Sequence, residues 1–343
     1  MNDEQLNRDR GASRRAAHPW VDVHAHPGRC FLCGLPEDDR QAAVLGGDRS
    51  DDAVVGVVAA GMAAVSFATV TDVRVIGARP DGSLYARREF EPGEVHADHR
   101  RQLEAIRSLA QRHDLPIVRS AADIEDAFSA GVTAMFITCE GADFVEGEFG
   151  RIDEAHLAGV RSITVVHYRQ NEFGDLQTEP AFHGGLSGAG RELVRQMNRV
   201  GMVVDLAHAT FETTLGALEE SVDPVMISHT HLAGGRRGHP RLVSDEHARA
   251  VAAAGGLIGA WPSGVTSETF DDFVDEVTRL AEVIGVEHVA IGTDMDANYK
   301  PVMTDYHGFA ALEVALLERG FSQREVDQVL GGNAIELIRQ VCG

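Results

Sequence analysis

The stretch "WVDVHAH", Trp20 to His26, is a short apolar run that ends in two histidines separated by one residue. A run of this length, rich in valine and followed by Pro-Gly, is typical of a buried β-strand. Residues i and i+2 of a strand point to the same side, so His24 and His26 can reach one ion. Because the chain has 16 histidines, the pair gains meaning only if other strands end in the same way.

Seven further runs rich in Val, Ile, Ala and Met follow, each bounded by turn residues and followed by a segment with helical character. With the first, the expected strands are 20–26, 63–70, 133–140, 161–168, 201–208, 224–230, 256–262 and 288–294, and the expected helices include 97–113, 121–130, 188–200, 210–220, 244–254 and 269–284. Eight alternations of nearly continuous apolar strand and helix predict an α/β fold, a closed parallel (β/α)8 TIM barrel. A doubly wound open sheet is the alternative, although it would more typically carry a glycine-rich phosphate loop, which the sequence lacks.

Three additions to a minimal barrel are expected. Residues 71–95 contain "DG" between two short alternating runs and predict a β-hairpin inserted after strand 2. Residues 116–120, "PIVRS", predict a short extra strand, and the tail predicts a C-terminal helical extension, one helix ended by Gly331-Gly332 and a second that packs on the barrel. Residues 1–18 are expected to be disordered or loosely docked, and 19–343 to form a single barrel domain.

Composition narrows the classes of partner. The formal net charge of −22 argues against nucleic acid and an anionic membrane surface, because both need a basic footprint. A small solute or a metal ion fits this charge better. No run reaches the length of a membrane span. No apolar segment follows Arg14-Arg15 in the polar N-terminal stretch, so a cytoplasmic location is expected.

The predicted strand ends carry a metal-binding set of side chains. In a TIM barrel the C-terminal ends of the strands converge on one open pocket, where catalysis takes place. Six of the eight predicted strands finish on a residue able to bind a metal or move a proton: His24 and His26, Glu140, His167, His208, His229 and Asp294. Imidazole and carboxylate are usual zinc ligands, so the sequence predicts a metal site.

The ligand types suffice for two ions, which would lie roughly 3.5 Å apart and share a bridging carboxylate and hydroxide. Many barrel hydrolases bridge their metals with a carbamylated lysine, but the only lysine here, Lys300, lies beyond the last strand. Glu140 is therefore the best bridging candidate. Asp294 remains as a carboxylate suited to take a proton from water and pass it to a leaving amine.

From about Val21 to the C-terminus the sequence resembles the renal (membrane) dipeptidases, zinc-dependent hydrolases of the amidohydrolase-type barrels. The resemblance rests on seven motifs in the expected order: "TCEGADFVEG", "SITVVHYRQNEFGD", "GGLSGAGRELVRQMNRVGMVVDLAHAT", "PVMISHTH", "HPRLVSDEHARAVAAAGGLIGAW", "HVAIGTDMDA" and "LGGN". Each motif alone is weak, but seven in register are specific.

The resemblance implies two Zn²⁺ ions, one on His24 and position 26 and the other on His208 and His229, with Glu140 bridging. It assigns the polarising histidine to His167, the catalytic aspartate to Asp294, and the arginine that binds the substrate's terminal carboxylate to Arg241. A bridging hydroxide would attack the peptide carbonyl, and His167 would stabilise the oxyanion.

The implied activity is zinc-dependent hydrolysis of dipeptides, including those with a D-residue at the C-terminal side. Hydrolysis of another small amide, such as an N-acyl amino acid, and a non-catalytic ligand-binding relative are the alternatives, and a homodimer is a further expectation. The chain departs from the family pattern at His26, where relatives often place aspartate, and at Leu242, where asparagine is common. Asp296 is open between a supporting and a loop role. Asp22 is expected to orient the strand 1 histidines or to lie in the polar interior of the barrel, and His231 is expected at an exposed rim rather than in the pocket.

Overall fold

The computed structural model describes residues 17–36, 38–80, 83–234 and 238–343. Within them, eight parallel strands close into a barrel in the order β1-β10-β9-β8-β7-β6-β5-β2. The barrel strands are β1 (Val21–Asp22), β2 (Ala64–Val70), β5 (Ala134–Glu140), β6 (Val160–Thr164), β7 (Val203–Asp205), β8 (Met226–Thr230), β9 (Leu257–Ala260) and β10 (Val289–Ile291). All eight expected strands are present, and the predicted (β/α)8 TIM barrel is confirmed.

The open-sheet alternative is wrong, because β1 pairs with strands on both of its sides. Asp22 lies opposite Ile291 of β10 and also opposite Val65 of β2, so the first and last strands close the ring. Every residue of β2 and β5 is buried, which explains why these strands are continuous apolar runs without alternation.

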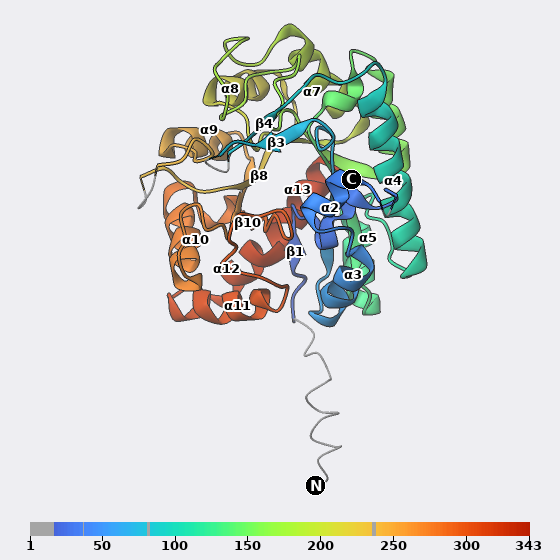
Figure 1. The fold of residues 1–343 in the computed structure, drawn as a ribbon. Helices are drawn as coiled ribbons and strands as arrows, with labels where there is room; N and C mark the ends of the chain where they lie inside the picture. Colours follow the sequence, from blue (N-terminus) through green and yellow to red (C-terminus); the bar gives the residue numbers. More distant parts are fainter. Residues whose placement is uncertain (1–16, 37, 81–82, 235–237) are drawn as a thin grey trace.

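Helices cover the outside and one end of the barrel (Figure 1). They are α2 (Arg40–Leu45), α3 (Ser50–Ala59), α4 (Glu94–Arg112), α5 (Ala121–Ala130), α6 (Gly150–Ala158), α7 (Gly188–Val200), α8 (Phe211–Glu220), α9 (Asp245–Ala253), α10 (Phe270–Ile284), α11 (Gly308–Glu318), α12 (Gln323–Asp327) and α13 (Asn333–Cys342). Short turns of other helix types are η1 (Pro27–Leu32), η2 (Asp143–Val145), η3 (Val286–His288) and the π-type η4 (Gln328–Gly332). Within the described chain, no helix is both long and apolar enough to cross a membrane.

The predicted hairpin after strand 2 is present as an antiparallel pair, β3 (Ile76–Ala78) and β4 (Leu84–Ala86). Its Asp81-Gly82 turn lies outside the described residues, as do positions 1–16 of the expected disordered segment. Arg79 next to β3 pairs with Glu179 at 2.8 Å, which ties the hairpin to the segment after β6. The expected extra strand at 116–120 is reduced to one parallel bridge between Ile117 and Met135.

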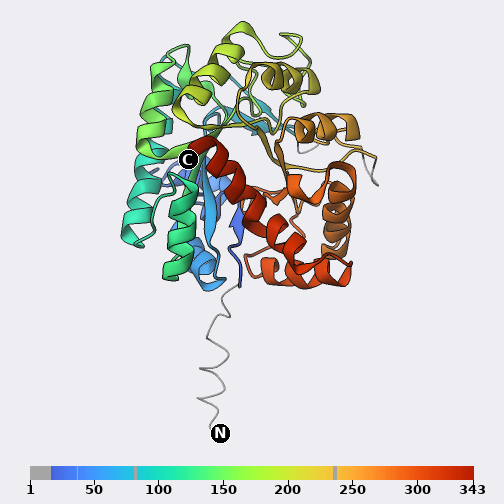
Figure 2. The same ribbon diagram turned by 180° about the vertical axis from the view of Figure 1, so that it is seen from behind.

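The C-terminal extension closes the bottom of the barrel. The helical path is interrupted at Gly331, as the sequence predicts, and a Cβ there would lie 2.0 Å from the carbonyl oxygen of Pro19. Asn333 of the "LGGN" motif donates from its side-chain amide to the carbonyls of Val286 and Val289, so this motif fastens α13 to β10. Figure 2, from behind, shows α13 crossing the barrel.

The helix α13 packs its apolar side on the first residues of the strands. One buried cluster contains Ile335, Leu337 and Ile338 from the helix together with Val21, Ala64, Ala134, Val203, Met226 and Leu257 from the strands. Each of these strand residues stands first in its strand. The opposite end of the barrel is therefore left for polar side chains.

Candidate metal centre

All seven side chains predicted for the strand ends are buried at the C-terminal end of the barrel. Their exposed fractions range from 0% for His26 to 8% for Asp294. Glu140 and His229 lie within β5 and β8, whereas the others follow strands that end three or four residues earlier than the sequence predicts. His208 and Asp294 have left-handed backbone, with φ of 67° and 52°, which takes the chain out of the β conformation before these residues. Strain of this kind collects at functional sites.

The Glu140 carboxylate lies at the centre of five imidazoles. Its Oε1 is 3.0 Å from Nε2 of His208, 3.4 Å from Nε2 of His24 and 3.8 Å from Nε2 of His229. Its Oε2 is 3.4 Å from Nε2 of His26 and 3.3 Å from Nε2 of His167. The predicted site residues therefore converge, although they come from five different strands.

Charge in this cluster is unevenly shared. Burial alone would raise the pKa of Glu140, but the imidazoles of His167 and His24 and the hydrogen bond to His208 hold it well below its usual range. Burial holds the pKa of His208 and of His229 well below the ordinary value. The two histidines are then neutral and Glu140 is ionised, which are the forms that bind a metal.

Asp294 joins the cluster beside His26. Its Oδ1 is 3.3 Å from Nε2 of His26, and its backbone N–H donates to the carbonyl of His24 at 2.8 Å. Burial lowers the pKa of His26, but the carboxylates of Asp294 and Glu140 overcome this and raise it to about 10. Two carboxylates facing one imidazole make this side of the cluster attractive to a cation.

The donor set fits metal ions. Three groups of side chains each bring three ligand atoms within 4.8 Å of one another: His24, Glu140 and His229; His24, His26 and Asp294; and Glu140, His167 and His208. The buried Nε2 atoms of His24 and His26 make no hydrogen bond with any described residue, despite their approach to Glu140. Orphaned buried nitrogens beside an ionised carboxylate are costly unless a ligand occupies them.

Two carboxylates near the cluster have supporting contacts only. Asp22 accepts from the backbone N–H groups of His24 at 3.2 Å and of Thr293 at 3.0 Å, so it joins the ends of β1 and β10 rather than orienting an imidazole ring. Asp296 accepts from the backbone N–H of Gly28 at 2.6 Å and fastens the loop after β1. The loop role left open for Asp296 is the one observed.

Arg241 lies against the cluster and is 1% exposed. Its Nη2 donates to Nε2 of His229 at 2.9 Å, its Nη1 donates to Oε1 of Gln177 at 2.8 Å, and its guanidinium lies over the Trp261 ring. A buried guanidinium without a carboxylate partner among these contacts is suited to receive one from a ligand. Leu242, the residue after Arg241, is 9% exposed.

Sequence reasoning missed Asp72 and misplaced His231. Asp72 lies two residues after β2. Its carboxylate accepts three hydrogen bonds from residues that follow β6, including one from His167. Asp72 lies two positions past the expected strand 63–70, so counting ionisable residues up to two positions beyond each strand would have included it. The expected exposure of His231 is wrong, because it is 3% exposed and its ring lies beside Trp261.

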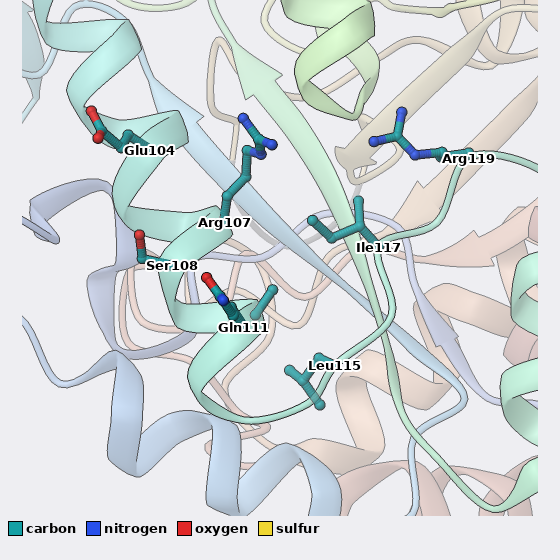
Figure 3. A pocket seen from close by; sticks show the side chains of 8 residues that line it. Glu104, Arg107, Ser108, Gln111, Leu115, Ile117 and Arg119 are labelled. Carbon is teal, nitrogen blue, oxygen red and sulfur yellow. The ribbon is translucent and has the colours of Figure 1, made fainter.

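A separate hollow of about 480 Å³ lies on the outer surface between α4 and the segment before α5 (Figure 3). It is lined by Glu104, Arg107, Ser108, Ala110, Gln111, Leu115, Ile117 and Arg119. None of these residues belongs to the cluster around Glu140, so the hollow is separate from the candidate metal centre.

Comparison with known proteins agrees with the metal centre that the geometry indicates. Residues 78–342 match the model of the membrane dipeptidase family, peptidase family M19. Dipeptidase verJ of Clonostachys rogersoniana is 31% identical over 249 residues, 70% of this chain and 64% of that protein. Dipeptidase tcpJ of Claviceps purpurea is 29% identical over 267 residues, 74% of this chain and 63% of that protein. The chain thus spans less than two thirds of these relatives.

Solved structures share the fold over nearly the full chain. An amidohydrolase from Pseudomonas aeruginosa superposes with a TM-score of 0.72 at 25% identity and covers 100% of both chains. A metallo peptidase from Rhodobacter sphaeroides, solved with a phosphinate mimic of the dipeptide L-Ala-D-Ala, gives a TM-score of 0.79 at 19% identity over 95% of this chain and 100% of that one.

Proposed function

The chain belongs to the membrane dipeptidase family, peptidase family M19, and we propose that it hydrolyses dipeptides at the cluster around Glu140. The observation that carries the proposal is one ionised, buried carboxylate ringed by five imidazoles at the open end of the barrel. An arrangement of this kind costs folding free energy unless it binds a ligand. Metal-dependent hydrolysis is the chemistry for which barrels use this position.

We assign the cluster to two zinc ions. His24 and His26 would hold one ion, His208 and His229 the other, and Glu140 both; zinc accepts this mixture of nitrogen and oxygen ligands. Asp294 lies close enough to His26, at 3.3 Å, to complete the first set where relatives often use an aspartate at position 26. When bound, the ions supply Lewis acidity that acidifies water and polarises a peptide carbonyl.

Three side chains would handle the substrate. His167 presents Nε2 toward the cluster, where it can donate a hydrogen bond to the carbonyl oxygen as negative charge develops there. Asp294 would accept a proton from the attacking water and deliver it to the departing amine. Arg241 would bind the terminal carboxylate, exchanging its contacts with Gln177 and His229 for a charged partner.

The proposal includes dipeptides with a D-residue at the C-terminal side. Arg241 would recognise the terminal carboxylate of the substrate rather than its C-terminal side chain. Dipeptides with an L- or a D-residue at the C-terminal side both carry this carboxylate. Residues 235–237, which include two further arginines, lie outside the described residues.

A substrate panel tests the function directly. Purified protein with added zinc is offered L,L and L,D dipeptides and the same dipeptides acetylated at the amine, while metal content is measured by mass spectrometry. We expect about two zinc ions per chain and turnover of free dipeptides. Preference for the acetylated compounds would point instead to N-acyl amino acid hydrolysis, and full activity in metal-free protein would refute the proposal.

A further inference from the structure

Asp72 is a fully buried carboxylate that contacts the end of β6 through both of its oxygens. Its Oδ1 is 2.7 Å from Nδ1 of His167. Its Oδ2 accepts from the backbone N–H groups of Tyr168 at 3.0 Å and Arg169 at 2.9 Å. The two oxygens therefore serve different partners, an imidazole on one side and the turn after β6 on the other.

The chain reaches this position by crossing the end of β5. Thr71 donates from its backbone N–H to the carbonyl of Glu140 at 3.0 Å, and its hydroxyl lies so close to Gly141 that a Cβ there would be 2.3 Å away. Gly141 also has a φ of 89°, which favours glycine. Gly141 therefore leaves room for the segment that carries Asp72 across the end of β5 toward β6.

The contact fixes how His167 faces the candidate metal centre. A carboxylate oxygen accepts only, so Nδ1 of His167 carries the hydrogen of this bond. The ring is then held at one edge and presents Nε2 to Glu140, at 3.3 Å from Oε2. The negative charge beside Nδ1 also stabilises the protonated ring, the form in which Nε2 keeps a hydrogen and can donate it to an oxygen that becomes negative during reaction.

We propose that Asp72 is a positioning residue that holds His167 through Nδ1 and aims its Nε2 at the substrate carbonyl. This inference rests on the proposed function for the role of His167, but not for the contact itself. A purely structural role, fastening Tyr168 and Arg169, would need only Oδ2. The separate use of Oδ1 for the imidazole is what favours the positioning role.

Asp72→Asn separates the two roles, because the amide oxygen can still accept from the backbone while its NH2 replaces the carboxylate at Nδ1. We expect kcat to fall by about 10-fold or more, as for other residues that orient an active-site histidine, with KM within about threefold. In a His167→Asn background the same substitution should change kcat by less than about twofold, since residues that act as a unit are not additive.

Asp143→Asn is the matched control. Asp143 is buried in the same region and contacts Arg169 at 2.8 Å and the Thr71 hydroxyl at 3.2 Å, without a contact to His167. Its kcat should stay within about threefold of the parent. Thermal unfolding and zinc content are measured for each variant, and Asp72→Glu, which keeps the charge, replaces Asp72→Asn if the latter does not fold.

A spectroscopic readout stands apart from activity. In zinc-loaded protein with nitrogen-15 labelled histidine, His167 should show a downfield Nδ1–H signal that disappears in Asp72→Asn and His167→Asn but persists in Asp143→Asn. Equal losses of kcat in the parent and His167→Asn backgrounds, or a signal that survives Asp72→Asn, would overturn the inference. If the signal behaves as expected while no dipeptide is hydrolysed, the proposed function fails and the positioning contact stands.

Discussion

The amino-terminal ends of six of the eight strands carry small and apolar side chains beneath α13, whereas the carboxyl-terminal ends carry five imidazoles around Glu140. Both ends are buried. Apolar burial at the first end lowers the free energy of the folded state. Burial of charge at the second end raises it, unless ligands satisfy the charged groups.

The backbone shows the same contrast. At the polar end, His208, Asp294 and Asp296 all have left-handed φ values, between 52° and 68°. A non-glycine residue in that region costs on the order of 1 kcal/mol or more. The comparison teaches that one end of the barrel supplies stability and the other uses part of it to hold a reactive cluster.

Glu140→Gln tests the polar end with the largest expected effect. The amide cannot be ionised, so it is a poor bridge for two cations among five imidazoles. Dipeptide turnover should fall by about 10³-fold, and the zinc content should drop. Turnover and metal content are measured on the same preparation.

The control for Glu140→Gln is Glu146→Gln, the same chemical change at a side chain that is 27% exposed and paired with Arg151. It should leave turnover and zinc content unchanged. Full turnover in Glu140→Gln would remove Glu140 from the centre of the site and weaken the contrast between the two ends.

Asp294→Asn is expected to have the next largest effect. Loss of the proton acceptor should lower kcat on the order of 10²-fold, while the amide oxygen keeps a ligand atom beside His26 and the zinc is retained. Asp296→Asn is the matched control, because Asp296 has the same left-handed backbone but contacts only the loop at Gly28. Similar losses of kcat in both variants would argue against proton transfer through Asp294.

The fold and most of the metal-binding set could be predicted from the sequence. The sequence has eight nearly continuous apolar runs, and six of them finish on a residue able to bind a metal or move a proton. Few architectures other than a closed barrel fit this pattern. The strand ends were less predictable, because His167 and His208 lie three residues past β6 and β7. At His208 the backbone is left-handed, which no sequence period reveals.

The contacts of Asp72 and His231 show what the sequence could not reveal. Asp72 acts across the end of β5 on a residue 95 positions away, and this contact exists only once the strands are side by side. His231 is covered by Trp261 and lies 3.9 Å from Glu276 of α10, so its burial depends on packing between elements that are distant in sequence. Sequence rules that consider one residue at a time cannot predict such pairs.

Ile338→Val tests the apolar end and has the smallest expected effect. Ile338 is 2% exposed in α13, within the cluster that covers the first residues of the strands. Loss of one methylene should lower the free energy of unfolding by about 1 kcal/mol, measured by urea denaturation, and leave kcat unchanged. Val314→Ala in α11 is the control, because this side chain is 55% exposed. It should change the free energy of unfolding by less than about 0.5 kcal/mol. A loss of turnover in Ile338→Val without loss of zinc would mean that packing beneath the barrel positions the cluster at its mouth, and the two ends would then not be separable.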